Sequence, residues 1–373
     1  MARKRRAAVV YAPEKWEIRE YELEPLQPTD AWMKVEMCGV CGTDVHVFHN
    51  QDPFPWSHPF VLGHEPVGVL AEIGPDFPKK DEYGNPLKEG DRIVFQAWTC
   101  GECYACRTLL VPNLCMGSPR AHKRALPGMM GGFSEYLYVP EHAYIFRVPD
   151  NMPTETAVLV EPMHIALGAL QRAMIPGLPQ RGEGMGPGKV VTILGAGTIG
   201  LLAMIVAKCL GAWKTIMIGG PAYRLNLCRE FGADHVISIE ETPDSKERIQ
   251  MVKDLTPHGL GADVVIEAAG VATAFAEGIE MARRGGTMVE VGHFTNRGTV
   301  EINPFTICLK HLDILGSWVT PPADFGTALR IMEANQDRFD FTKLITHRFT
   351  LDQTGEAVKL ARSQQAMKPV VIL

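Results

Sequence analysis

The sequence lacks the features that would place it in a membrane or direct it out of the cell. Nowhere in its 373 residues is there an apolar run of about eighteen, so no transmembrane helix is expected. The basic residues 3–6 are followed by charged positions rather than by the apolar core of a signal peptide. The formal net charge of −6 is otherwise spread along the chain, which gives no reason to expect nucleic acid or a membrane surface as a partner. We therefore expect a globular protein of the cytoplasm.

Disulfide bonds are also unexpected, although the chain has nine cysteines. The number is odd, no export signal precedes them, and several are clustered, which favours thiolate ligands in a reducing compartment. The remaining cysteines are predicted to be small core residues: Cys38, Cys209, Cys228 and Cys308. The cluster has the spacing C-x2-C-x2-C-x8-C and comprises Cys100, Cys103, Cys106 and Cys115. Four thiolates on one short loop can surround a tetrahedral zinc and leave it no open position, so we predict a structural zinc site.

Two patterns divide the chain. The first 150 or so residues are rich in glycine, proline and short apolar runs and predict a β-rich domain without a convincing helix. From about residue 155 a helix-like segment leads through a Pro/Gly-rich loop to strands that alternate with helices, which predicts a parallel sheet with helices on both faces. The predicted strands are 189–194, 214–220, 235–239, 262–270 and 287–294. The last six residues, KPVVIL, are predicted to be a strand that returns to the first domain.

A G-x-G-x-x-G turn follows the first strand of the alternating region and opens an apolar helix. In that context Gly195 forms the tight turn, Gly197 lets backbone approach a pyrophosphate, and Gly200 allows close helix packing. An acidic residue that would hold the ribose hydroxyls is missing at the end of the next strand, where Gly219 stands, and Arg224 is the nearest basic residue. We therefore predict that NAD and NADP both bind, with NAD slightly preferred, and that Gly219→Asp sharpens this preference. The predicted cofactor-binding residues are Gly195, Gly197, Thr198, Ile199, Gly200, Gly219, Arg224, Gly270 and Val291.

A second possible metal site is scattered along the chain. Cys41, His64, Glu65 and Glu161 lack the short spacing of a zinc finger, so only the fold can bring them together. A mixed shell of sulfur, nitrogen and oxygen with one exchangeable carboxylate leaves room for water or an alcohol oxygen, whose pKa zinc lowers. Such a shell suits catalysis rather than structure.

With these motifs the chain resembles the zinc-containing medium-chain dehydrogenase/reductase family along its whole length, particularly the polyol, threonine and secondary-alcohol dehydrogenases. The matching segments are GVCGTDVH, VLGHEPVG, CGECYAC, GGFSEYLYVP, VEPMHIALGAL, ILGAGTIGLLA and VEVGHF. The resemblance implies that Cys41 and His64 are catalytic-zinc ligands, that Glu65 binds zinc directly or exchanges with water, and that Glu161 takes the variable third position. It also implies that Thr43 passes the alcohol proton away from zinc and that His46 stands at the solvent end of that relay.

The chain departs from the family pattern at two places. Eight residues separate Cys106 from Cys115 where the family usually has seven, and Gly219 replaces the acidic ribose ligand. The first departure predicts a bulge in the cysteine loop, and the second leaves the cofactor open. His164 and His293 match no family role and are expected to be surface or hydrogen-bonded histidines, although His164 follows Glu161 closely enough to reach the same cleft.

The resemblance implies an α/β protein in which a Rossmann doubly wound domain, residues 161–304, accompanies a β-rich GroES-like catalytic domain, residues 1–160 and 305–373. It implies an alcohol dehydrogenase with two zinc ions and NAD or NADP, acting on a small alcohol or ketone as a homodimer or homotetramer. The alternatives are a zinc-free enone or quinone reductase and a non-catalytic protein that has kept the fold. Large side chains near the motifs indicate either a bulky substrate or core packing: Phe48, Phe54, Trp56 and Trp98.

Overall fold

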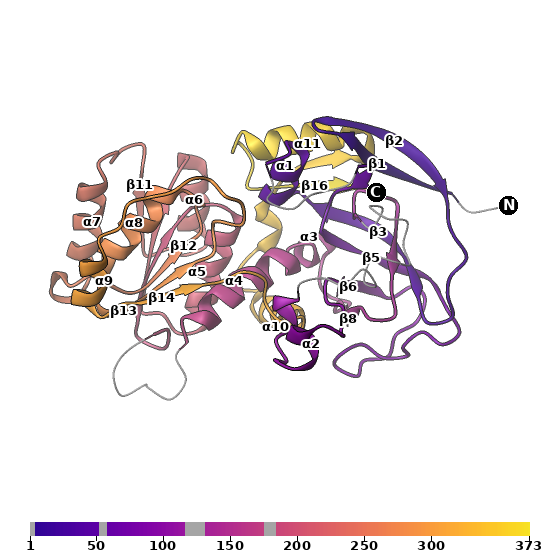
Figure 1. The fold of residues 1–373 in the computed structure, drawn as a ribbon, viewed down its shortest axis with the longest axis horizontal. Coiled ribbons are helices and arrows are strands. Elements are labelled where there is room, and N and C mark those ends of the chain that lie inside the picture. The colour runs from indigo at the N-terminus through magenta and orange to yellow at the C-terminus, as the bar shows by residue number, and fades with distance from the viewer. Residues whose placement is uncertain (1–3, 52–57, 116–130, 175–183) are drawn as a thin grey trace. The chain divides into compact units, whose positions relative to one another are not determined.

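The computed structural model describes residues 4–51, 58–115, 131–174 and 184–373, which form two compact units (Figure 1). The first unit contains residues 1–161 and 321–373, and the second contains residues 162–320. Sequence analysis placed the later boundary at residue 304. In the structure the second unit extends to residue 320, because residues 313–316 form a strand that pairs with β13 (Ala282–Glu290) and adds one strand to the sheet of this unit.

The first unit is built from β-strands. Strands β15, β16, β3, β5, β6 and β8 follow one another in one sheet, where β7 also pairs with β3, and β2, β1 and β4 form a smaller sheet. The C-terminal strand β16 lies antiparallel beside β3, which confirms the predicted return of the chain end to this unit. The strands are β1 (Lys4–Ala12), β2 (Lys15–Glu22), β3 (Ala31–Gly39), β4 (Phe60–Val61), β5 (Glu65–Ile73), β6 (Arg92–Gln96), β7 (Tyr136–Val139), β8 (Tyr144–Arg147), β15 (Ile345–Thr350) and β16 (Lys368–Ile372).

Two short helices, α1 and α2, lie in the first 150 residues of this unit, where the sequence predicted no convincing helix. Helix α1 is only seven residues long, too short for a helical period to stand out, and it buries Val45 and Phe48, three residues apart, on one face. The helices are α1 (Gly42–Phe48), α2 (Tyr104–Arg107), α3 (Thr154–Ala157), α10 (Ala323–Asn335) and α11 (Thr354–Arg362), and the unit boundary falls in the first turn of α4 (Val160–Arg172).

The second unit contains a parallel six-stranded sheet in the order β11-β10-β9-β12-β13-β14. The chain winds outward from β9 in one direction and then restarts on the other side at β12, so the connecting helices cover opposite faces. This confirms the predicted doubly wound α/β fold. The elements are β9 (Val190–Leu194), α5 (Thr198–Cys209), β10 (Lys214–Gly219), α6 (Ala222–Glu230), β11 (His235–Ser238), α7 (Ser245–Asp254), β12 (Ala262–Glu267), α8 (Ala272–Met281), β13 (Ala282–Glu290), α9 (Pro304–Lys310) and β14 (Asp313–Gly316).

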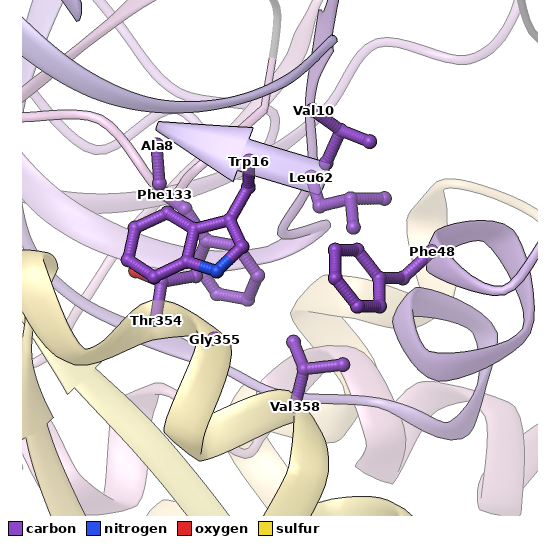
Figure 2. Close-up of a pocket in the computed structure, with 9 residues that line it drawn as sticks. All are labelled: Ala8, Val10, Trp16, Phe48, Leu62, Phe133, Thr354, Gly355 and Val358. Carbon is purple, nitrogen blue, oxygen red and sulfur yellow. The ribbon is translucent and has the colours of Figure 1, made fainter. Parts of the chain in front are cut away.

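The large side chains near the motifs have different environments. Phe48 is buried in the core of the first unit and lines a small apolar pocket together with Trp16 and Val358 (Figure 2). Trp98 is 54% exposed, and Phe54 and Trp56 lie outside the described residues. Phe48 therefore serves packing. Of the cysteines predicted to be core residues, Cys38 and Cys228 are buried and Cys209 is partly buried, but Cys308 is exposed, so that prediction is wrong for Cys308.

Candidate metal centres and dinucleotide site

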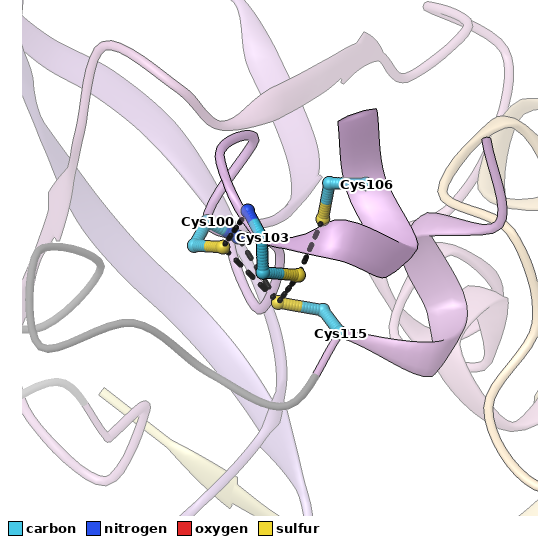
Figure 3. Close-up of side chains that lie close together, drawn as sticks. All are labelled: Cys100, Cys103, Cys106 and Cys115. Carbon is cyan, nitrogen blue, oxygen red and sulfur yellow. Dashed lines mark hydrogen bonds between the residues drawn. The ribbon is translucent and has the colours of Figure 1, made fainter. Parts of the chain in front are cut away.

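The cysteine loop follows β6 and brings its four sulfur atoms together (Figure 3). Cys103 Sγ lies 3.6 Å from Cys106 Sγ and 3.8 Å from Cys115 Sγ, and Cys115 Sγ lies 3.4 Å from Cys100 Sγ. These separations are too long for disulfide bonds of about 2.05 Å. They are close to the edge of a tetrahedron with Zn–S bonds of about 2.3 Å, in which neighbouring sulfur atoms are about 3.8 Å apart.

Backbone and charge in the loop both suit a bound cation. The backbone N–H of Cys100 donates to Cys115 Sγ at 3.3 Å, and that of Cys103 donates to Cys100 Sγ at 3.4 Å. Burial and the neighbouring thiols of Cys103 and Cys115 raise the pKa of Cys106 to about 12. Adjacent thiolates are therefore unfavourable without a positive charge among them, and the donor set fits zinc with no open position.

Asp44 joins the two segments that carry Cys41 and His64. Its Oδ2 accepts a hydrogen bond from the backbone N–H of Cys41 at 2.9 Å, and its Oδ1 accepts one from Gly63 at 3.0 Å. The same Oδ1 lies 3.3 Å from His64 Nδ1. Asp44 is 1% exposed and sits in the first turn of α1, so this helix holds the loop before it and the residue before β5 in one place.

The contact with Asp44 also orients the imidazole of His64. A carboxylate on Nδ1 fixes the ring and leaves Nε2 as the nitrogen that can bind a metal. Burial would lower the pKa of His64, but Asp44 and Cys41 raise it well above its usual value. Burial would raise the pKa of Asp44, yet His64 and the backbone donors lower it. Sequence analysis missed Asp44, although its place in GVCGTDVH, three residues after Cys41, was a usable signal because an acid there can cap the helix.

Glu65 lies within the same group but has a second partner. Ligand atoms of Cys41, His64 and Glu65 all lie within 4.8 Å of one another. Both carboxylate oxygens of Glu65 also accept hydrogen bonds from Lys368 Nζ at 2.6 Å. Gly39 makes this possible, because a Cβ atom there would lie 1.9 Å from Glu65 Oε2.

The ion pair between Glu65 and Lys368 is buried, with 0% and 4% of the two side chains exposed. Burial would lower the pKa of Lys368, but Glu65 and Cys41 raise it above its usual value, so the amine stays charged. Lys368 belongs to the strand KPVVIL and is separated from Glu65 by some three hundred positions in the chain, so no local pattern could have revealed it.

Glu161, in the first turn of α4, lies outside the group of ligand atoms within 4.8 Å. It still shares the electrostatic environment of that group. Burial raises its pKa to about 7, His64 and Lys368 oppose the rise, and Glu65 adds to it. A carboxyl group that titrates near neutrality beside a metal set can change between a neutral and a ligating state.

Thr43 and His46, the predicted relay residues, both lie on α1, three positions apart and thus on one side of the helix. Thr43 Oγ1 is 3.7 Å from Cys41 Sγ, and both side chains are partly exposed. His164 belongs to the second unit, where it is 2% exposed and its backbone oxygen accepts a hydrogen bond from Thr320 Oγ1 at 3.5 Å.

In the second unit the glycine turn has the geometry of a phosphate-binding loop. Gly195 has φ +112°, and a Cβ there would lie 2.6 Å from the carbonyl carbon of Ala268. A Cβ at Gly200 would lie 1.8 Å from Gly195 O, so both positions require glycine. Gly197 is the N-cap of α5 and has no side-chain cap, and within 4 Å its Cβ position would meet only Arg224 Nη1 among the described residues. The backbone N–H groups at the start of a helix suit a pyrophosphate, and Thr198 and Ile199 lie in the first turn of α5.

The structure changes the interpretation of Gly219. A Cβ at this position would lie 2.8 Å from the backbone nitrogen of Ala196 and 2.9 Å from its Cβ. An Asp side chain at this position would therefore press against the glycine turn, which argues against the expectation that Gly219→Asp sharpens the NAD preference. Arg224 does face this turn: its Nη1 lies 3.9 Å from the Cβ position of Gly197, and its Nε donates to Tyr223 Oη at 3.0 Å.

The later strand ends close the same edge of the sheet. Gly270 has φ +64°, and a Cβ there would lie 2.5 Å from the carbonyl oxygen of Gly292. The backbone N–H of Val291 donates to Glu267 O at 3.0 Å. Gly270 follows the carboxyl end of β12, which pairs with β9, and Val291 follows that of β13, the next strand, at the edge where ligands of doubly wound sheets bind. Among the described residues, the structure contains no helix with the length and apolar character needed to cross a membrane.

Two family models match this chain. Residues 27–150 match the alcohol dehydrogenase GroES-like domain, and residues 198–334 match the zinc-binding dehydrogenase model. Among solved structures, an alcohol dehydrogenase from Thermotoga maritima is 31% identical with a TM-score of 0.88 and 99% of each chain covered. A zinc-binding dehydrogenase from Sinorhizobium meliloti bound to NADP is 29% identical with a TM-score of 0.83 and 100% of each chain covered.

Two curated relatives extend over nearly the whole chain. The 5-exo-hydroxycamphor dehydrogenase of Pseudomonas putida is 29% identical and covers 98% of both proteins. A sorbitol dehydrogenase of Halalkalibacterium halodurans is 30% identical over 90% of this chain and 89% of its own. The chain therefore belongs to the zinc-containing medium-chain dehydrogenase family and is an alcohol oxidoreductase that uses zinc and a nicotinamide dinucleotide.

Proposed function

We propose that the chain interconverts a secondary alcohol and its ketone, on substrates of the polyol or cyclic-alcohol kind, with the catalytic metal held in the first unit and the dinucleotide in the second. The observation that carries this proposal is the pairing of Cys41 and His64 through Asp44. Sulfur and nitrogen donors next to two carboxylates form a shell that can keep one position open. The relatives named for hydroxycamphor and for sorbitol support this choice of substrates.

In this proposal Cys41, His64 and Glu161 hold the metal, and Glu65 is the exchangeable carboxylate. Both carboxylate oxygens of Glu65 accept hydrogen bonds from Lys368, so Glu65 would bind the metal only when this ion pair is broken. Glu161 can lose its proton near neutrality and is then a stronger ligand. When bound, zinc supplies Lewis-acid polarisation of the alcohol oxygen, and the nicotinamide ring supplies the hydride acceptor.

The proton path runs along α1. The Thr43 hydroxyl can accept the proton of the substrate and donate its own, because a hydroxyl is both donor and acceptor. Thr43 lies beside Cys41 and therefore next to the proposed metal. His46 stands one helical turn further on, where a partly exposed imidazole can exchange the proton with solvent.

The cofactor lies on the second unit, with its pyrophosphate at Gly195, Gly197 and Gly200. The open N-terminus of α5 and the guanidinium of Arg224 support this position. Arg224 can bind ribose hydroxyls or a 2′-phosphate, so both dinucleotides are accepted and NAD is slightly preferred. Arg224 Nε already donates a hydrogen bond to Tyr223, so the guanidinium has one donor fewer for a 2′-phosphate. This supports a weak preference for NAD over NADP.

The chain holds two zinc ions, the second at the loop of four cysteines. The sulfur separations and the high pKa of Cys106 support this assignment. Such thiolate sites need a reducing compartment, which supports a cytoplasmic location. We also propose a homodimer or homotetramer. Support comes from strand β14, which pairs with β13 alone among the described residues, while Trp318 beyond it is 41% exposed and Phe305 of α9 is 65% exposed.

The test is a screen of secondary alcohols, polyols and their ketones with zinc-loaded protein and either NAD or NADP. We expect NAD(P)-dependent oxidation that Cys41→Ala and His64→Ala abolish, while the binding of NADH stays close to that of the wild type. Cys308→Ala, which removes an exposed thiol, is the matched control and should keep full activity. Reduction of enones without alcohol oxidation, or full activity in Cys41→Ala, would refute the proposal.

A further inference from the structure

A third group of potential ligands lies at the carboxyl edge of the parallel sheet in the second unit. Glu267 ends β12, Glu290 ends β13, and the two residues are direct neighbours in the strand register. Residues paired in register project on the same face of a sheet, so the two carboxylates meet. Like charges placed opposite one another are unfavourable unless something positive lies between them.

His293 completes the group from the turn after β13. Its Nδ1 lies 3.0 Å from Glu290 Oε1 and 3.5 Å from Glu267 Oε2. Ligand atoms at about 2.0–2.2 Å from a tetrahedral metal are about 3.3–3.6 Å apart. The 3.5 Å separation lies in this range, and the 3.0 Å contact, which is a hydrogen bond without a metal, would have to lengthen by a few tenths of an ångström. Gly292 preserves the space, because a Cβ there would lie 2.3 Å from Glu267 Oε2.

Among the described residues, His293 is the one side chain in ion-pair range that could balance the charge of the two carboxylates. Glu267 is completely buried, and among the described residues neither carboxylate has a lysine or arginine within the 4.0 Å of an ion pair. Two ionised carboxylates in this setting therefore need a cation to be stable.

Two atoms of the group also lack partners. Glu290 Oε2 and His293 Nε2 are inaccessible to solvent and make no hydrogen bond in the part of the chain that the structure describes. Buried polar atoms are rarely left without a partner, because each such atom costs about 1–3 kcal/mol. An unmatched carboxylate oxygen beside an imidazole and a second carboxylate is an arrangement that a metal ion with bound water would satisfy.

We propose that Glu267, Glu290 and His293 bind a divalent cation of the kind that prefers nitrogen and oxygen ligands, such as Mn²⁺. This site differs from the two zinc centres in lacking sulfur, which disfavours the softer ions. The cation joins the ends of β12 and β13. It thereby fixes the adjoining turns, since Glu267 Oε1 also accepts hydrogen bonds from the backbone N–H groups of Ala269 and Gly270 at 2.8 and 2.9 Å.

The experiment uses the full chain with its thiolate sites filled by zinc, titrated with Mn²⁺ and followed by the electron paramagnetic resonance signal of the free ion. We expect one equivalent of Mn²⁺ to bind. Glu290→Gln and His293→Gln should each weaken this binding by at least about tenfold, as the loss of a ligand demands. Glu241→Gln removes an exposed carboxylate from the same unit and should bind Mn²⁺ like the wild type.

Glu290→Gln keeps the shape of the side chain and removes a like charge. Without Mn²⁺, we therefore expect the zinc-loaded variant to unfold at a higher temperature than the zinc-loaded wild type. Circular dichroism and NADH binding report whether each variant is folded. The proposal is wrong if the zinc-loaded wild type takes up no equivalent of Mn²⁺, as expected if the two carboxyl groups share a proton instead. It is equally wrong if both variants bind Mn²⁺ as tightly as the wild type.

Discussion

Lys368→Met should be among the most destabilising single substitutions in the first unit. It removes the only partner found within 4.0 Å for the carboxylate of Glu65 among the described residues, and it leaves that carboxylate buried. Breaking one side of a buried ion pair costs about 3–5 kcal/mol, because the remaining charge is neither solvated nor paired. In a domain of some two hundred residues, this corresponds to a fall of roughly 6–20 °C in the midpoint of thermal unfolding.

A double-mutant cycle separates the ion pair from simple loss of packing. Glu65→Gln combined with Lys368→Met removes both charges and should recover most of the lost stability, since an uncharged pair of similar volume needs no compensation. Lys359→Met, on the exposed side of α11, is the matched control and should stay within about 0.5 kcal/mol of the wild type. Thermal and urea unfolding of proteins that keep the four-cysteine zinc but have lost the catalytic zinc provide the free energies of unfolding.

The same substitution should also affect turnover. Without Lys368, both oxygens of Glu65 become available to the metal group within 4.8 Å, so Glu65 competes with the substrate for the open position. We expect a lower kcat with the zinc content unchanged. If Lys368→Met lost less than about 1 kcal/mol, or if the double variant were no more stable than Lys368→Met, the ion pair would not have the role argued here.

Four further outcomes follow from the site. In metal-free protein the raised pKa of Glu161 means that the folded state binds the proton more tightly. Its contribution to stability should therefore fall as the pH rises from about 4.5 to 7, by up to about 1.4 kcal/mol per pH unit, and Glu161→Gln should make the pH dependence of urea unfolding less steep by that amount. Thr43→Val should lower kcat and alter its pH profile while metal analysis still finds zinc; an unchanged profile would exclude the relay. Mild chelation should remove one zinc together with activity before the four-cysteine zinc, and active protein with fewer than two zinc ions would contradict the assignment. Gly219→Asp should weaken the binding of both NAD and NADP, because overpacking against the glycine turn costs about 1–3 kcal/mol. Arg224→Ala should instead change the ratio of the affinities for NAD and NADP. A sharpened NAD preference in Gly219→Asp would show that the turn can relax.

The alternating half of the chain could be predicted because its signals are local. Each strand and helix from 189 to 294 has its own apolar pattern, and the order of the strands then follows from the handedness of the crossovers. The ends of elements were less predictable. The predicted strand 287–294 begins at Ala282 in the structure, where basic residues and glycines hide the β pattern, and stops at Glu290.

The proposed metal ligands could be identified from the sequence, but the residues that hold them in place could not. The spacing of Cys100 to Cys115 shows a site directly, because one loop provides all the donors. Cys41 and His64 are brought together by a buried aspartate, and Glu65 is held by a lysine from the opposite end of the chain. These contacts depend on the pairing of β3 with both β5 and β16, which is a long-range feature that no local pattern contains.

Gly39 and Gly292 have matching roles in the two units. Each removes a Cβ that would collide with a buried glutamate: Glu65 in the first unit and Glu267 in the second. A buried carboxylate next to a glycine is well shielded from water, so a specific positively charged group must balance its charge. In the first unit Lys368 provides that group. In the second the described residues provide only His293, and this difference is why a metal ion is the stronger candidate there.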